Sequence, residues 1–267
     1  MSLPKRHFGS SELMVSPLGL GTVKLGRNTG VKYPKSFHIP DDADAANLIA
    51  LAKSLGINLI DTAPAYGNSE QRLGNLLKGQ RQDWVICSKV GEEFDATSGD
   101  SHFDYSARHT RQSIERSLDR LATDYLDIVL IHSDGHDEHI LQHEGALTAL
   151  QQCKQEGLIR AIGMSTKTVS GGLLAAELGD AVMATYNRAY QDEVTVLDYC
   201  ARHGKAVILK KAFGSGHLVN EQEPAQTAMQ FSLAHSGVTS AIVGTINPEH
   251  LRENVAACLH ALEASKD

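Results

Sequence analysis

Apolar residues recur along this chain in short blocks that alternate between two kinds. Continuous apolar runs closed by glycine or polar residues are typical of buried strands, and apolar residues at helical spacing are typical of helices. On this basis we predict strands at 18–22, 57–61, 84–89, 125–132, 158–165, 181–187, 205–210 and 240–244. Helices are predicted between and after them, at 42–55, 70–78, 106–121, 144–156, 169–178, 192–203, 224–236 and 248–262.

Capping residues support the helix boundaries. Ser69 and Ser106 each stand at a predicted helix start, where a side-chain oxygen accepts a hydrogen bond from a free backbone N–H group. Asn247, followed by Pro248, opens the last helix in the same way. Gly79 is predicted to end the second helix, because glycine favours the left-handed turn that closes a helix.

Three segments follow neither pattern. Residues 6–15 are predicted to form a small hairpin with its turn at 9–11. Residues 26–40 combine polar residues with glycine and proline, which indicates a loop. Residues 91–105 are too polar for the core, so we expect a long surface loop, and loops of that length are often functional.

The regular alternation of strands and helices predicts the architecture. Strands joined by helices in this way are parallel, and their crossovers are right-handed. An open doubly wound sheet is the alternative, but it is usually marked by G-x-G-x-x-G after the first strand, and LGLGTVKLG fits that motif poorly. A chain of 267 residues suits one closed barrel of about 250 residues. We therefore predict a single domain over residues 1–267, an α/β protein with the (β/α)8 TIM-barrel fold.

Composition narrows the class of protein. The chain is 42% hydrophobic and 21% charged, which is ordinary for a globular protein. Its net charge of −7 argues against a nucleic-acid or membrane partner, and no apolar run reaches the length of a membrane span. The four cysteines lie far apart without a C-x-x-C pair, and the N-terminus lacks a signal-peptide pattern. We expect a cytoplasmic protein with reduced cysteines and a small-molecule partner.

Polar side chains end three predicted strands that are neighbours in the ring. Asp61 ends the second strand, Lys89 the third and His132 the fourth. Tyr66 follows the second strand in a loop marked by proline and glycine. Catalytic residues of TIM barrels lie at the C-terminal ends of the strands and on the loops that follow. We therefore expect these four side chains to meet at one mouth of the barrel.

These four residue types suit one kind of chemistry. A phenol with a pKa of about 10 is a poor proton donor at neutral pH, but a nearby ammonium group favours the phenolate and lowers that pKa. A carboxylate beside the lysine keeps the lysine charged and fixed in place. A histidine opposite can hydrogen-bond a carbonyl oxygen. Together they suit protonation of an oxygen while hydride arrives at its carbon.

The chain resembles the aldo-keto reductase family over residues 5–260. Asp61, Tyr66, Lys89 and His132 match that family's catalytic tetrad, and DTAPAYG matches its DTAxxYG signature. The resemblance implies an NAD(P)H-dependent oxidoreductase that reduces an aldehyde or ketone, or oxidises the corresponding alcohol or aldose, by direct hydride transfer. Tyr66 would be the general acid and Lys89 would tune it, while His132 would place the substrate carbonyl. The hairpin at 6–15 would cover the barrel floor.

The resemblance also implies a dinucleotide that lies across the barrel mouth without a Rossmann domain. Three positions near the nicotinamide depart from the family's usual residues. Thr166 stands in place of asparagine, Met183 in place of glutamine and Lys210 in place of an aromatic residue. The residues implied near the nicotinamide are Thr22, Asp61, Ser165, Thr166, Met183 and Lys210.

The phosphate and adenosine ends fall at the last two strands. Two lysines and two glycines follow the seventh strand in KKAFGSGHL, and TIM barrels often bind phosphate there. The N-terminus of the last helix offers N–H groups and the positive end of its dipole to an anion. The implied pyrophosphate residues are Lys210, Lys211, Phe213, Gly214 and Ser215, and the implied adenosine residues are Gly244, Thr245, Asn247, His250, Glu253 and Asn254.

The choice of cofactor depends on the same last helix. NADP(H) is the family's usual cofactor, and its extra phosphate favours an arginine or lysine. The only arginine or lysine within 244–254 is Arg252, and His250 is charged only below its pKa of about 6.5. We therefore predict NADP(H) binding with a reduced preference, and NAD(H) use stays an alternative.

Other interpretations stay beside these. The histidine-rich segment 132–143 suggests a metal site, but no H-x-H pair or second carboxylate-bearing strand end completes it, so we expect no metal. A second function is that of a regulatory homologue, which binds the cofactor and reports its redox state with little turnover. The substrate stays open among sugars, aromatic aldehydes and small ketones, and the oligomeric state between monomer and dimer.

Overall fold

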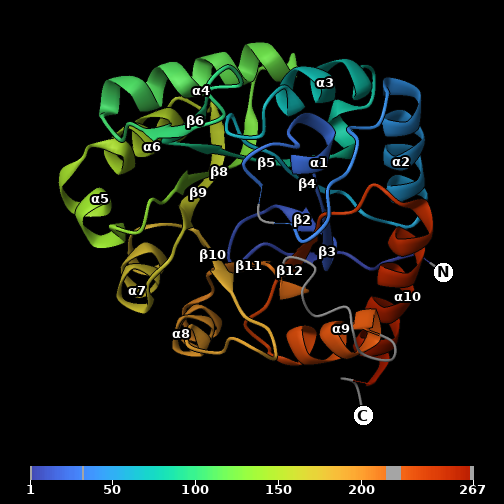
Figure 1. Cartoon of the computed structure of the whole chain (residues 1–267). Coiled ribbons are helices and arrows are strands. Elements are labelled where there is room, and N and C mark those ends of the chain that lie inside the picture. Colours follow the sequence, from blue (N-terminus) through green and yellow to red (C-terminus); the bar gives the residue numbers. More distant parts are fainter. Residues whose placement is uncertain (1, 32, 215–223, 265–267) are drawn as a thin grey trace.

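Eight parallel strands close into a barrel that helices surround, and Figure 1 shows the chain running once around the ring. The computed structural model describes residues 2–31, 33–214 and 224–264. The strands around the ring are β3 Leu18–Gly21, β4 Leu59–Asp61, β5 Val85–Val90, β8 Leu126–His132, β9 Ile159–Ser165, β10 Ala181–Thr185, β11 Ala206–Lys210 and β12 Ser240–Val243. Strand β12 pairs with β3 and so closes the barrel. The predicted TIM barrel is confirmed.

Helices connect the strands on the outside of the barrel (Figure 1). Three further short helices of the described residues were not predicted, namely α1, the 3₁₀-helix η1 and α5, and each lies in a connection between predicted elements. The helices are α1 Val23–Gly26, α2 Asp42–Ser54, α3 Ser69–Leu76, η1 Arg81–Asp83, α4 Ala107–Leu121, α5 Asp137–His143, α6 Ala146–Gln155, α7 Val169–Leu178, α8 Val194–His203, α9 Pro224–Ala234 and α10 Pro248–Ala264.

The barrel strands are buried on both faces, which explains their continuous apolar runs. In β8, Ile128 and Leu130 belong to an inner cluster that also holds Leu59 of β4. Val129 and Ile131, on the alternate face, belong to the larger cluster between the strands and the helices. Side chains therefore fill the barrel interior, and a ligand has access only at an end of the barrel.

The N-terminal hairpin closes the end of the barrel where the strands begin. Strands β1 Arg6–His7 and β2 Met14–Val15 pair antiparallel, as predicted. Phe8 is fully buried and belongs to the inner cluster. Gly9, with φ of +58°, packs so closely that a Cβ there would lie 2.8 Å from the backbone nitrogen of Ala206, the first residue of β11. The opposite end, where the strands finish, stays available for a site.

The prediction of a surface loop at 91–105 was wrong in part, because this segment contains a second hairpin. Strands β6 Glu92–Phe94 and β7 Ser101–Phe103 pair antiparallel directly after β5. The turn between them is held by Asp95, whose main-chain oxygen accepts from the N–H of Gly99. Three-residue strands with glutamate, serine and histidine are too short and too polar for an alternating pattern to reveal them. This hairpin stands beside the C-terminal ends of β5 and β8.

Two helix predictions also need correction. The helix expected at 144–156 begins only at Ala146, because Gly145 adopts φ of +89° and separates it from α5, which is a helix of its own. Ser69 was expected to be a cap, but Asn68 precedes α3 and the Ser69 hydroxyl instead donates to Thr22 Oγ1 over 2.8 Å. The helix ends at Leu76, before Gly79, which lies in the turn beyond.

Candidate active site

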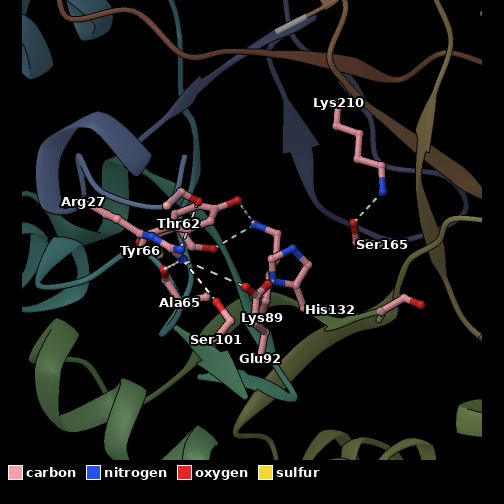
Figure 2. A network of polar contacts seen from close by, with 12 residues as sticks. Arg27, Thr62, Ala65, Tyr66, Lys89, Glu92, Ser101, His132, Ser165 and Lys210 are labelled. Carbon is pink, nitrogen blue, oxygen red and sulfur yellow. Dashed lines mark hydrogen bonds and ion pairs between the residues drawn. The ribbon is translucent and has the colours of Figure 1, made fainter. Parts of the chain in front are cut away.

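Three neighbouring strands deliver ionisable side chains to the end of the barrel that the hairpin leaves open. Asp61 is the last residue of β4, His132 is the last residue of β8, and Lys89 lies one residue before the end of β5. The parallel register pairs Asp61 with Cys87 and Lys89 with Leu130. Strand ends that meet in this way place the three side chains side by side, and Figure 2 shows Lys89 and His132 together with Tyr66.

Tyr66 reaches the same place from the loop after β4. The loop turns tightly, and its Tyr66 N–H donates to the main-chain oxygen of Ala63. Gly67 follows with φ of +64°, and a Cβ there would lie only 2.1 Å from the main-chain oxygen of Gly26. Two glycines, one in this loop and one at the end of α1, thus let the two segments touch and fix where Tyr66 stands.

Lys89 is the centre of the polar network. Its Nζ atom donates to Asp61 Oδ1 over 2.5 Å, to the main-chain oxygen of Thr62 over 2.9 Å and to the Tyr66 hydroxyl oxygen over 3.0 Å. The Tyr66 hydroxyl in turn donates to Asp61 Oδ2 over 3.3 Å. Lys89 is 1% exposed and Asp61 3% exposed, so the pair is held away from water.

The charges in this network are set by burial and by the neighbours. Burial alone would lower the pKa of Lys89, but Asp61, Tyr66 and Cys87 together outweigh it and raise the pKa above its usual value, so the lysine is charged. Burial raises the pKa of Tyr66, and Asp61 raises it further. Lys89 lowers the Tyr66 pKa, as expected, but does not overcome burial and Asp61. Tyr66 therefore holds its proton at neutral pH.

His132 faces Tyr66 across the mouth. The two rings lie edge to face, with their centroids 6.4 Å apart. Nδ1 of the imidazole lies 2.8 Å from Glu92 Oε2, and the main-chain oxygen of His132 accepts from the Tyr105 hydroxyl over 2.9 Å. Burial lowers the pKa of His132, so the ring is neutral at pH 7. Sequence reasoning missed Glu92, because the hairpin that carries it was not recognised.

Arg27, which sequence reasoning also missed, joins three segments around the site. Its guanidinium donates to the main-chain oxygens of Ala65, Thr29 and Gly30. It also lies 3.9 Å from Glu92 Oε1 and stacks over the ring of Phe94, 3.6 Å from the centroid. The Tyr66 loop, the loop after α1 and the β6–β7 hairpin are thus held to one another by a single side chain.

The residues expected near the nicotinamide lie in different environments, some at the barrel mouth and one in the barrel interior. Lys210 donates to Ser165 Oγ over 3.0 Å and to the main-chain oxygen of Thr166 over 2.6 Å, on the other side of His132 from Lys89 (Figure 2). Burial lowers the pKa of Lys210 to about 8, although Glu193 opposes this. Met183 is 2% exposed and belongs to the inner cluster of the barrel.

Two hydroxyl groups in this region differ in how they are used. The Thr22 hydroxyl already donates to the main-chain oxygen of Asp61 over 2.9 Å, so it ties β3 to β4. The Thr166 hydroxyl is buried and has no hydrogen-bond partner among the described residues. A buried hydroxyl without a partner is costly. Thr166 Oγ1 is therefore the atom here that a bound polar group would satisfy.

The expected pyrophosphate residues follow β11. Lys211 has φ of +57°, which is unusual for a residue other than glycine, and its main-chain oxygen accepts from Asn187 Nδ2 over 2.9 Å. Gly214 also has a positive φ, and its N–H donates to the main-chain oxygen of Lys211. Phe213 packs partly buried against the core. Ser215 lies outside the described residues.

The expected adenosine end lies between β12 and α10. Asn247 caps α10, since its Oδ1 accepts from the N–H of Glu249 over 2.8 Å and from that of His250 over 3.4 Å. Two of the N–H groups expected to receive an anion are therefore already used. Gly244, His250 and Glu253 are exposed, Thr245 is half-buried and Asn254 is buried. Arg252 forms an ion pair with Glu249 at 3.8 Å.

Comparison with known proteins identifies this arrangement. A sequence model described as the aldo/keto reductase family matches residues 17–224. The chain belongs to the aldo/keto reductase family. A solved structure provisionally named an aldo-keto reductase, from Pseudomonas aeruginosa, is 53% identical, with 97% of this chain and 96% of that chain covered and a TM-score of 0.88.

Two characterised relatives show the range of reactions in similar proteins. An L-galactose dehydrogenase of Arabidopsis thaliana is 30% identical, and the match covers 94% of this chain and 87% of the relative. An NADH-specific methylglyoxal reductase of Escherichia coli is 27% identical, with 96% of this chain and 93% of the relative covered. Both are oxidoreductases of small carbonyl or sugar compounds, so this aldo/keto reductase is an oxidoreductase too.

The residues at the mouth of this aldo/keto reductase fit a nicotinamide cofactor. Thr166 Oγ1 is a buried hydroxyl without a partner, and Lys210 holds a cationic nitrogen beside it. At the expected adenosine end, a Cβ atom added to Gly244 would meet only the hydroxyl of Tyr33, 3.0 Å away, so the space beside this glycine is open. Within the described residues, no group of three or more metal-ligating side chains is gathered, and no helix is long and apolar enough to cross a membrane.

Proposed function

We propose that this aldo/keto reductase reduces an aldehyde or ketone with NAD(P)H, or runs the reverse oxidation of an alcohol or aldose, with Tyr66 as the general acid. One observation carries the proposal. The Tyr66 hydroxyl oxygen accepts a hydrogen bond from Lys89 Nζ over 3.0 Å, and Lys89 is paired with Asp61 over 2.5 Å. A phenol that keeps its proton and has a fixed cation beside its oxygen can give that proton away.

The reaction follows from this geometry. A nicotinamide dinucleotide held at this mouth would supply a hydride to the carbonyl carbon. As the carbonyl oxygen gains negative charge, Tyr66 transfers its proton to that oxygen, and the product is an alcohol. The ammonium group of Lys89 stabilises the phenolate left behind. Asp61 keeps Lys89 charged in a place where burial would otherwise favour the neutral amine. His132 forms the opposite wall, where a ring N–H of the protonated imidazole would donate a hydrogen bond to the substrate oxygen.

The cofactor would be held at two places. Ser165, Thr166 and Lys210 would meet the nicotinamide half, where Thr166 Oγ1 awaits a partner. Lys211, Gly214 and the N-terminus of α10 would meet the phosphates. We propose NADP(H) with only a modest preference over NAD(H), because Arg252 is already paired with Glu249. The existence of an NADH-specific relative supports keeping NAD(H) as the alternative.

The relatives suggest a class of substrate, and the cysteines suggest a cellular location. We propose a small carbonyl compound or sugar as substrate, because the relatives named above act on L-galactose and methylglyoxal. We also propose that the chain is one domain and that it works in the cytoplasm. All four cysteines are buried and free, which is typical of proteins in a reducing compartment.

The proposal is tested by an assay of the purified protein with both dinucleotides. Fluorescence titration first measures the affinity for NADPH and NADH. NADPH or NADH oxidation is then followed with a panel of sugars, aromatic aldehydes and small ketones. Turnover of any carbonyl class supports the proposal. Tight cofactor binding without turnover of any compound would contradict it and would favour the regulatory function.

A further inference from the structure

Glu92 and His132 form a contact that the reaction described above does not use. Glu92 Oε2 lies 2.8 Å from His132 Nδ1, and the two side chains are only 16% and 21% exposed. Figure 2 shows the carboxylate directly beside the ring. Nδ1 has no well-aligned hydrogen bond, so the carboxylate stands off the direction of the ring N–H. Catalytic hydrogen bonds are often poorly aligned before a ligand binds and tighten when it does.

The Glu92 carboxylate is fixed in place and ionised. The β6–β7 register pairs Glu92 with Phe103, and Arg27 lies 3.9 Å from Glu92 Oε1. Burial alone would raise the pKa of Glu92, but His132, Ser101 and Arg27 together lower it to about 2. At neutral pH this carboxylate can therefore only accept hydrogen bonds.

His132 is surrounded by groups of both signs. Glu92 from β6 raises the pKa of His132, whereas burial, Lys89 from β5 and Lys210 from β11 lower it. Tyr66, from the loop after β4, faces the ring with its proton in place. The net pKa of His132 lies below its ordinary value, so the ring is neutral at pH 7 and gains its second proton only at lower pH. The pKa of Glu92 is about 2, so its carboxylate is negative at neutral pH.

A neutral imidazole carries one proton, and its neighbours decide which nitrogen holds it. An ionised carboxylate beside Nδ1 accepts a hydrogen bond and so favours the proton on Nδ1. No hydrogen bond reaches Nε2 from the described part of the chain, so Nε2 is the nitrogen left for a ligand. Lone-pair electrons on Nε2 accept a hydrogen bond from a hydroxyl group but cannot donate one to a carbonyl.

We infer that Glu92 is a positioning residue that holds the proton of neutral His132 on Nδ1. The inference rests on the proposed function and adds a pH dependence to it. Nε2 of neutral His132 accepts a hydrogen bond from the hydroxyl group of an alcohol or aldose, so the neutral ring serves oxidation. Protonated His132 carries N–H on both nitrogens and donates from Nε2 to a carbonyl oxygen, so it serves reduction. The pair thus links the direction of the reaction to the protonation of one ring.

Removing the charge of Glu92 has a defined effect. In Glu92→Gln the cations Lys89 and Lys210 still face His132, but the opposing carboxylate is gone, so the His132 pKa falls. A neighbouring opposite charge shifts a pKa by about 1–3 units. The reduction rate needs protonated His132 and declines as pH rises. The midpoint of this decline is then expected at a pH about one unit or more below that of the parent. The rise of the oxidation rate moves to lower pH by the same amount.

Glu93→Gln is the matched control. Glu93 is the next residue of the same strand and contacts Arg116 and His109 of α4, not His132. If loosening of the hairpin alone mattered, both variants would change the pH profile in the same way. The inference predicts that the midpoint of the pH profile moves in Glu92→Gln and stays in place in Glu93→Gln.

The tautomer of His132 gives a test that needs no turnover. Nitrogen-15 NMR of histidine-labelled protein, without substrate, distinguishes a proton on Nδ1 from a proton on Nε2. The inference predicts Nδ1–H for His132 in the parent and in Glu93→Gln, and a loss of that preference in Glu92→Gln. A parent His132 with its proton on Nε2 would overturn the inference, even if the variants failed to fold and even if the proposed reaction were confirmed.

Discussion

The Nζ atom of Lys89 lies 3.0 Å from the hydroxyl oxygen of Tyr66, and the same Nζ atom lies 2.5 Å from Asp61 Oδ1. The lysine thus stands between the Asp61 carboxylate and a phenol that holds its proton. In the resting chain, burial and Asp61 keep the Tyr66 pKa above its ordinary value. The lysine matters most after the proton has left, when it is the cation nearest the phenolate in this network.

Removing the lysine should affect stability as well as activity. Lys89→Met leaves the Asp61 carboxylate, which is 3% exposed, without its charge partner. Breaking a buried ion pair from one side costs about 3–5 kcal/mol. Chemical denaturation should show a loss of this size in Lys89→Met and a much smaller loss in the Asp61→Asn/Lys89→Met double variant. Both variants should be nearly inactive. Equal stability of Lys89→Met and the parent would show that Asp61 does not depend on this partner.

Cofactor affinity should fall as pH rises through the pKa of Lys210, which is about 8. The protonated amine attracts the anionic dinucleotide, and the neutral amine does not. A hydrogen bond to a charged group contributes about 1.5–3 kcal/mol, so the dissociation constant should rise about tenfold from about pH 7 to about pH 9. Fluorescence titration across this range measures the change.

Lys205 supplies the control for that titration. It stands at the other end of the same strand, where its Nζ donates to the main-chain oxygen of Gly179. Lys210→Met should lose the pH dependence of binding, whereas Lys205→Met should keep it. A pH dependence that persists in Lys210→Met would place the titrating group elsewhere.

The Tyr66 loop should tolerate no side chain at Gly67. This residue has φ of +64°, and a Cβ would lie 2.1 Å from the main-chain oxygen of Gly26. Gly67→Ala should therefore destabilise the chain by about 1–3 kcal/mol and displace Tyr66, so that kcat falls. Gly79→Ala is the comparison, because φ is +78° there but no atom lies within 4 Å of the added Cβ. A kcat loss as large in Gly79→Ala would contradict a specific role of the Gly26 contact.

The barrel and the strand ends could be predicted from the sequence because both depend on local patterns of apolar and polar residues. Buried parallel strands need apolar residues on both faces, so a polar residue such as Asp61 or His132 at the end of one is easily seen. The β6–β7 hairpin was hidden because its strands have three residues each. Glu92 was therefore missed, although it lies within 3 Å of a residue that was found.

Other features depend on contacts between distant segments. Arg27 holds Ala65 and Glu92, and no periodic pattern connects residues that far apart in the sequence. The pKa of Tyr66 depends on how far burial outweighs Lys89, which only the packed structure shows. The N–H groups at the start of α10 were expected to be free, but the side chain of Asn247 takes two of them.

The most direct test of this account is the activity of Tyr66→Phe with a carbonyl substrate that the parent reduces. Loss of a general acid usually costs about 10²–10⁴-fold in rate. The account predicts a fall in kcat of that size, with unchanged dinucleotide affinity. Tyr125→Phe, which removes a hydroxyl beside the start of β8 at the closed end of the barrel, should retain the parent rate. A Tyr66→Phe enzyme with a kcat near that of the parent would contradict the assignment of Tyr66 as the proton donor.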